Sequence, residues 1–272
     1  CRWCRRAASR ACGGSSNEPS APVAIHSPVD VVVPKQLKAL QIDCGDFFTC
    51  ARLEDKSTRC WGRNKAGELG RGRGPEEPRP VIVGRLEGAS QLSRGGNFGC
   101  ALCPDRDLHC WGTGRIIGDG VMREIAPPTS VVLPRDAVEL HANGVVACTR
   151  TDSSGLRCWG PRPSAKGLVP EVQNGVARVA VASSHACVLL GEGAVRCWGE
   201  DEWFPRAPKS FANPRVSPAH EVVTGDAFAC VVTNTGKAQC WGRNDSGQLG
   251  LPADTVSRPN PVDVPGVTEV KH

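Results

Sequence analysis

The tripeptide Cys-Trp-Gly occurs five times in this 272-residue chain, and each copy follows another cysteine at a fixed distance. The copies begin at Cys60, Cys110, Cys158, Cys197 and Cys240, and the earlier cysteines, ten positions before, are Cys50, Cys100, Cys148, Cys187 and Cys230. Successive copies lie 39 to 50 residues apart, so the distance between repeats varies while the inner spacing does not. The cysteine pair therefore belongs to a rigid local unit, and the length variation falls in loops elsewhere.

A β-hairpin explains the constant inner spacing. In CVVTNTGKAQC, pairing Cys230 with Cys240 leaves residues 234–236 as a three-residue loop, whose last position favours glycine in a left-handed conformation. Glycine stands there in two repeats, at Gly193 and Gly236, while the other three repeats have Lys56, Arg106 and Ser154. Opposed cysteines on neighbouring strands have Cα atoms about 4.5 to 5.5 Å apart, which a disulfide tolerates. We therefore expect five cross-strand disulfides.

Short apolar segments flank each hairpin and have the character of β-strands. Those before the hairpins lie at 37–42, 89–93, 137–142, 176–182 and 221–223, and proline-flanked ones after the hairpins lie at 80–83, 130–134 and 261–265. Three to four short strands in each repeat of about 45 residues is the pattern of a β-propeller blade. A β-sandwich would not need the same unit five times. We predict an all-β fold of four-stranded blades, with five hairpin-bearing repeats and a partial sixth.

Two repeats carry a family resemblance. The segments CARLEDKSTRCWGRNKAGELG and CVVTNTGKAQCWGRNDSGQLG, at 50–70 and 230–250, resemble the repeat of the regulator of chromosome condensation family, in its cysteine-rich bacterial branch. The resemblance covers roughly residues 28–272 and implies a β-propeller, usually of seven blades. The chain holds fewer repeats than that. Either it is a fragment, or a last strand at 267–271 pairs with a first at 29–33 and closes a smaller ring.

The repeated tryptophans and glycine loops have a structural interpretation. An array of repeats must bury the same face in every unit, so we expect the five tryptophans to pack between blades; they are Trp61, Trp111, Trp159, Trp198 and Trp241. The glycine loops at 67–70 and 247–250 lack the following Lys-Ser or Lys-Thr of a phosphate-binding loop. We interpret both loops as turns.

Five cysteines remain outside the predicted pairs: Cys1, Cys4, Cys12, Cys44 and Cys103. An odd number means that at least one is free, lipidated or paired between chains. The Cys-x-x-Cys at 1–4 has no second ligand pair at the spacing of a zinc site. In the second such motif, at 100–103, the two side chains would face opposite sides of a strand. We therefore predict no metal site and no cofactor.

The N-terminal segment differs in composition from the rest. Residues 1–27 are basic and then rich in Gly, Ser and Pro, and we expect a disordered or tethering segment before a propeller domain at 28–272. Arg2, Arg5, Arg6 and Arg10 supply four of the five net positive charges, so the propeller body is not expected to bind nucleic acid. Residues 9–22 are similar to the start of a bacterial lipoprotein. No transmembrane segment is predicted, while the disulfides indicate an oxidising, extracytoplasmic location, secreted or cell-surface.

No catalytic constellation is present, and an enzyme is not predicted. The six histidines are scattered, and no nucleophile elbow or carboxylate pair at a defined spacing occurs. Propellers carry function in the loops between blades, where arginine and aromatic side chains commonly anchor partners. The candidate partner-binding residues are Arg63, Lys65, Arg71 and Arg73 in the first loop, and Trp203 and Phe204 in the fourth.

We therefore expect a non-catalytic scaffold that binds a protein or a glycan through its loops. The family resemblance offers a guanine-nucleotide exchange factor for a small GTPase as the first alternative. Against that alternative stand the predicted disulfides and the lack of a long insertion that could enter a GTPase. The second alternative is a propeller that inhibits an enzyme by covering its active site.

Overall fold

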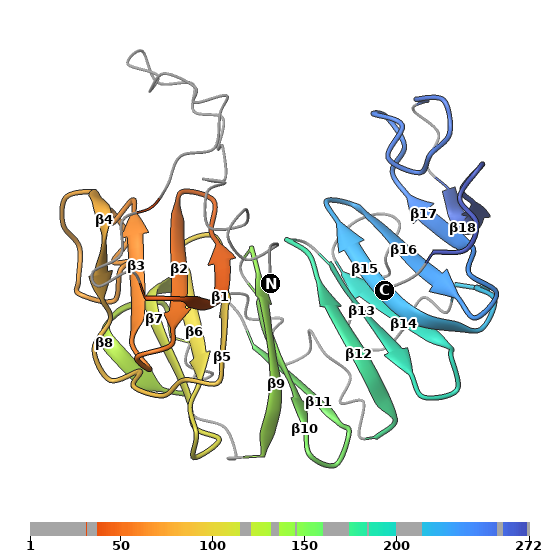
Figure 1. Ribbon diagram of the computed structural model, residues 1–272. Helices are drawn as coiled ribbons and strands as arrows, with labels where there is room; N and C mark the ends of the chain where they lie inside the picture. The colour runs from red at the N-terminus through yellow and green to blue at the C-terminus, as the bar shows by residue number, and fades with distance from the viewer. Residues whose placement is uncertain are drawn as a thin grey trace. The chain divides into compact units, whose positions relative to one another are not determined.

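The structure is a computed structural model that describes residue 31 and residues 37–114, 121–131, 136–144, 146–159, 174–183, 185–199, 214–254 and 258–270. All regular secondary structure in these described ranges is β-strand (Figure 1). The chain divides into two compact units, Cys1–Val145 and Val146–His272. The predicted boundary between residues 27 and 28 lies outside the described residues, so the two-segment division stays a prediction.

The first unit contains two complete four-stranded antiparallel sheets, each with its strands in chain order. We call them blade 1 and blade 2. Blade 1 consists of β1 (Ala39–Cys44), β2 (Phe48–Leu53), β3 (Thr58–Gly62) and β4 (Glu77–Ile82), and blade 2 of β5 (Gln91–Arg94), β6 (Phe98–Leu102), β7 (Leu108–Gly114) and β8 (Arg123–Ser130). A further strand, β9 (Ala137–Asn143), lies against β5.

The second unit contains the remaining three hairpins. The hairpin of β10 (Val146–Thr151) and β11 (Leu156–Trp159) comes first, then the three-stranded sheet of β12 (Val176–Val181), β13 (His185–Leu190) and β14 (Val195–Gly199). The fifth hairpin belongs to a complete four-stranded sheet, which we call blade 5. It consists of β15 (Ala219–Gly225), β16 (Phe228–Thr233), β17 (Ala238–Gly242) and β18 (Arg258–Asp263). The all-β prediction of repeated four-stranded blades is thus confirmed.

The five hairpins pair the cysteines directly across from one another. The register places Cys50 opposite Cys60 and Cys230 opposite Cys240, and the other three repeats do the same. All five pairs are disulfides in the structure, with Cα–Cα distances of 4.0 to 4.1 Å. The pairing expected from the ten-residue spacing is therefore what the structure contains.

The hairpin loops share one backbone conformation regardless of sequence. The last loop residue has positive φ in every repeat, at Lys56 (67°), Arg106 (61°), Ser154 (58°), Gly193 (84°) and Gly236 (78°). Two short backbone bonds close the first loop: Lys56 N–H donates to the Leu53 carbonyl at 3.1 Å, and Leu53 N–H donates to Ser57 at 2.9 Å. Three non-glycine residues thus adopt a conformation that L-residues seldom occupy.

The outer strands begin earlier than the sequence predicted. β4 and β18 start at Glu77 and Arg258, and β8 ends at Ser130, where the expected third outer strand would have begun. These strands include Pro80, Pro127 and Pro261. Proline is tolerated on an edge strand because the missing N–H would point away from the sheet.

The predicted ring-closing strand is not regular where it is described. Residues 267–270 form no strand, although the Val270 N–H donates to the Gly236 carbonyl at 3.0 Å. Its proposed partner at 29–33 lies almost wholly outside the described residues. Ring closure therefore stays a prediction.

Candidate functional site

The loop after β3 is shaped by the residues that recur in the family-like repeats. The Asn64 side chain accepts from the Leu69 N–H at 3.2 Å and donates to the Gly72 carbonyl at 3.0 Å, and Gly67 and Gly70 have φ of 78° and 68°. In blade 5, Asn244 makes the equivalent bonds to Leu249 and Pro252. The glycine loops are turns, as expected, and the structure adds that an internal asparagine side chain holds each of them.

Tryptophan contacts join consecutive repeats within each unit. Trp111 of blade 2 is 1% exposed and donates its indole N–H to the Glu68 carbonyl of blade 1 at 2.7 Å. In the second unit, Trp241 packs in one apolar cluster with Leu189 and Val195 of the preceding hairpin, and Trp198 packs in another with Leu156. Trp159 is also buried, whereas Trp61 is half-buried.

Arg63 has internal partners. Its Nε lies 2.7 Å from Oε1 of Glu68, a carboxylate with no exposed surface, and its Nη2 donates to the Asn97 side chain. The guanidinium also lies over the Phe47 ring, 4.1 Å from the centroid. Arg63 therefore ties the first loop to blade 2, a role that its position in a basic sequence run did not reveal.

Arg73 is paired as well. Its Nε lies 2.7 Å from Oε2 of Glu124 on β8, and its backbone N–H donates to Oε1 of the same carboxylate at 2.9 Å. The Arg73 side chain is 62% exposed, so the pair is at the surface. Each oxygen of Glu124 thus contacts Arg73 of the first loop.

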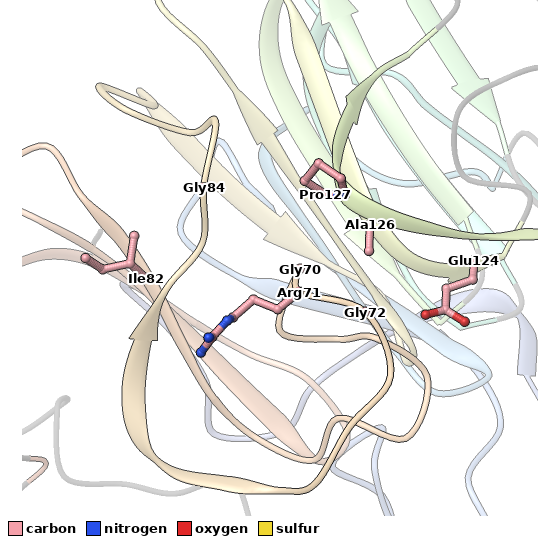
Figure 2. Close-up of a pocket in the computed structure, with 8 residues that line it drawn as sticks. All are labelled: Gly70, Arg71, Gly72, Ile82, Gly84, Glu124, Ala126 and Pro127. Atoms are coloured by element: carbon pink, nitrogen blue, oxygen red, sulfur yellow. The ribbon is translucent and has the colours of Figure 1, made fainter.

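Lys65 and Arg71 differ from these two arginines. Both side chains are exposed, and neither forms an ion pair with any residue in the described ranges. Figure 2 shows the Arg71 side chain extending from its loop toward Ile82. Of the four predicted basic residues, these two remain open to a partner.

A pocket of about 620 Å³ lies between this loop and β8 (Figure 2). Its lining comprises Gly70, Arg71, Gly72, Ile82, Gly84, Glu124, Ala126 and Pro127. Two of these residues, Gly72 and Gly84, are glycines at which a side chain would meet open space. Because Arg73 neutralises Glu124, the one charge in the lining without an opposite partner among the described residues is Arg71.

No sequence pattern indicates this pocket. Its apolar residues come from β4 and β8, and only Arg71 is among the predicted binding residues. The aromatic pair Trp203 and Phe204 lies outside the described residues, so its candidate role stays a prediction.

Two cysteines among the described residues, Cys44 and Cys103, are outside the disulfides. Cys103 is buried, and burial, followed by the charges of Asp105 and Asp107, raises the pKa of its thiol to about 11. Cys44 is half-buried, and Cys1, Cys4 and Cys12 lie outside the described residues. Among the residues that are described, no group of three or more His, Cys, Asp or Glu could hold a metal ion. No helix in that part of the chain is long and apolar enough to cross a membrane.

Consecutive antiparallel sheets with the same cross-linked hairpin define this chain as a protein of β-propeller blades. The family models described as "Regulator of chromosome condensation (RCC1) repeat" match residues 40–68, 220–248 and 236–272. The chain carries repeats of the regulator of chromosome condensation family, which confirms the predicted resemblance. Membership in its cysteine-rich bacterial branch stays a prediction. A comparison with curated proteins gave no match.

Solved structures with the same fold include distant relatives. Human WBSCR16 is 18% identical with a TM-score of 0.72, covering 87% of this chain and 70% of its own. Prp20p from Saccharomyces cerevisiae is 17% identical with a TM-score of 0.67, and the match covers 84% of this chain and 63% of Prp20p. The ectodomain of the Arabidopsis thaliana receptor kinase ACR4 is 21% identical with a TM-score of 0.55, covering 88% and 73%. At these identities the likeness shows the fold alone, and the chain spans less than two thirds of Prp20p.

Proposed function

We propose that this chain is a non-catalytic scaffold that binds a protein partner through the first loop and the adjacent pocket. The observation that carries the proposal is Arg71, an exposed cation in a pocket, with no opposite charge bound to it among the described residues. Lys65 adds a second free cation in the same loop. An arginine beside exposed apolar surface is a common anchor of protein interfaces.

Solved relatives support a protein as the partner. The structure of Prp20p was reported with its binding properties to Gsp1p and histones, and yeast RCC1 was solved bound to Kap60. The eight pocket residues include no aromatic side chain on which a sugar ring could stack. We therefore favour a protein over a glycan.

Exchange-factor activity is not part of the proposal. The similarity to Prp20p, at 17% identity, shows the fold alone. An inhibitor that covers an enzyme is one form of the protein-binding role, and the target would be identified with the partner.

We also propose an extracytoplasmic location. Five disulfides in a chain of this size are typical of proteins that fold in an oxidising compartment. A tether at residues 1–27 is a separate proposal from the sequence. Mass analysis of the protein isolated from its source, with thiols blocked before lysis, should show the five pairs oxidised. Ten reduced thiols at these positions would contradict this location.

Partner capture tests the binding role. Wild-type protein and the Lys65→Glu/Arg71→Glu variant would be used as baits in extracts of the source organism, with a Trp203→Ala/Phe204→Ala variant in parallel. A captured partner would then be purified and its affinity for each bait measured. We expect the charge-reversed variant to lose affinity. The proposal fails if wild type retains no protein, or if the purified partner binds the charge-reversed variant as tightly as wild type.

A further inference from the structure

We propose that the pocket beside Arg71 binds a peptide segment in which a carboxylate lies next to an aliphatic side chain. The inference deepens the proposed function and rests on it, because it names the chemistry that the pocket recognises. Two features of the lining carry it: a free guanidinium and exposed apolar surface near it.

The charge in the pocket selects an anion. Glu124 is bound through both oxygens to Arg73, by an ion pair at 2.7 Å and a backbone hydrogen bond at 2.9 Å. It therefore does not compete for Arg71. A guanidinium presents two parallel N–H groups that match the geometry of a carboxylate.

The apolar part of the pocket lies within reach of that guanidinium. Ile82 is 55% exposed, and Ala126 and Pro127 complete the apolar lining. Figure 2 shows Arg71 extending toward Ile82 from the loop, with Ala126 and Pro127 on the facing strand. A ligand that binds Arg71 would thus place its neighbouring side chain against apolar surface and remove that surface from water.

Two glycines leave open space at the pocket. Gly84 has no atom within 4 Å of the position a Cβ would take, and at Gly72 the nearest atoms would lie 3.8 Å and 4.0 Å away. The opening between the loop and β8 is therefore not filled by side chains at these positions. A short peptide is therefore a suitable probe of this opening.

Short synthetic peptides provide the test. The probe is a fluorescently labelled hexapeptide, Ser-Gly-Glu-Leu-Gly-Ser, with both ends blocked, and its binding to the full chain is followed by anisotropy. Matched peptides replace Glu by Gln, or Leu by Ser. A fourth peptide ends in Leu with a free carboxyl group and has no Glu, which separates a terminal carboxylate from a side-chain carboxylate. A fifth carries phosphoserine in place of Glu.

We expect substitutions in the charged part and in the apolar part of the pocket to weaken peptide binding. Arg71→Gln should weaken binding of the Glu-Leu peptide by about tenfold or more, since one charge-assisted contact is lost. Ile82→Ser should weaken it less, and should not affect the peptide in which Leu is replaced by Ser. The control is Arg79→Gln, which removes an exposed arginine from β4 outside the pocket lining and should leave the affinity within about twofold.

Three results would overturn the inference. They are no binding of either carboxylate peptide at millimolar concentration, equal losses in Arg71→Gln and Arg79→Gln, and preference for phosphoserine over both carboxylates. Failure of this inference can be distinguished from failure of protein binding. If a captured partner protein binds Arg71→Gln as well as wild type but loses affinity for Trp203→Ala/Phe204→Ala, protein binding stands and this pocket is not its site.

Discussion

The indole N–H of Trp111 donates a hydrogen bond of 2.7 Å to the backbone carbonyl of Glu68, and so joins blade 2 to the loop of blade 1. The tryptophan is 1% exposed, and the same loop carries Arg71 and Arg73 at its far end. The scaffold contact and the candidate site therefore share one loop. Substitutions of Trp111 therefore test how much the contact between the blades contributes to stability, separately from the binding residues.

Replacing Trp111 should separate its packing from its hydrogen bond. Trp111→Phe leaves the buried Glu68 carbonyl without its donor, which should lower the free energy of unfolding by about 1 to 3 kcal/mol. Trp111→Ala also removes most of the ring and should cost about 3 to 5 kcal/mol. Urea unfolding measures both. Trp61→Phe, at the half-buried equivalent position, is the control and should cost less than Trp111→Phe.

Gly99 should be intolerant of a methyl group. A Cβ there would lie 2.3 Å from Cζ2 of Trp111, so either the ring or strand β6 must move. We expect Gly99→Ala to destabilise the fold by about 1 to 3 kcal/mol. Gly84→Ala meets no atom within 4 Å, and its melting temperature should be unchanged or slightly raised. Equal melting temperatures for the two variants would contradict the packing described for Trp111.

Arg63 and Arg243 occupy the same repeat position but should differ in effect. Arg63 pairs with Glu68, which has no exposed surface, whereas Arg243 pairs with Asp245 at the surface, at 2.6 Å. Arg63→Ala leaves a buried carboxylate without its cation and should cost about 2 to 3 kcal/mol. Arg243→Ala should have little effect. The prediction is wrong if both substitutions shift the urea midpoint equally.

Removing one disulfide should destabilise the chain measurably. The loop closed by Cys187 and Cys197 spans ten positions, for which loop entropy predicts a loss of about 2 to 3 kcal/mol in the double alanine variant. Cys44→Ala, at a free and half-buried cysteine, is the control and should cost less. Chemical unfolding under non-reducing conditions gives both values. If the double variant is as stable as wild type, this disulfide does not contribute to the stability of the fold.

Cys103 should resist alkylation in the folded protein. Its thiol has a pKa raised to about 11, and the thiolate is the reactive form. At pH 8 only about one thiol in a thousand is ionised, and reaction should accelerate as the pH rises toward 11. Peptide mapping after iodoacetamide treatment at pH 8 should show Cys103 modified only when the protein is unfolded. Rapid labelling at pH 8 would contradict its burial.

Two glutamine side chains form contacts between strands that the sequence did not predict. The Gln41 side chain bonds both the N–H and the carbonyl of Leu92, at 2.9 and 2.7 Å, and Gln91 does the same with Leu140. These side chains bridge consecutive inner strands. No local pattern marks them, because their partners lie about 50 residues away and a polar residue on a strand normally indicates a solvent-facing position.

The sequence alone determined the repeat, the hairpin and the cysteine pairing. These features depend on local spacing, so that an offset of ten residues with a three-residue loop leaves Cys50 opposite Cys60. The predicted starts of the outer strands were wrong because these strands contain proline. Edge strands tolerate proline, and no local sequence pattern shows that a strand lies at an edge. The chemistry of the basic loop could not be determined from the sequence.

Only the tertiary structure decided which of the four basic side chains are open to a partner. Arg63 and Arg73 find Glu68 and Glu124, while Lys65 and Arg71 have no carboxylate partner among the described residues. Glu124 comes from a different blade and lies far from Arg73 along the chain, so the sequence does not indicate that the two residues pair. Charge neutralisation depends on separations of a few ångströms in space. The folding of blade 2 beside the first loop therefore leaves Arg71 as the charge that a ligand can bind.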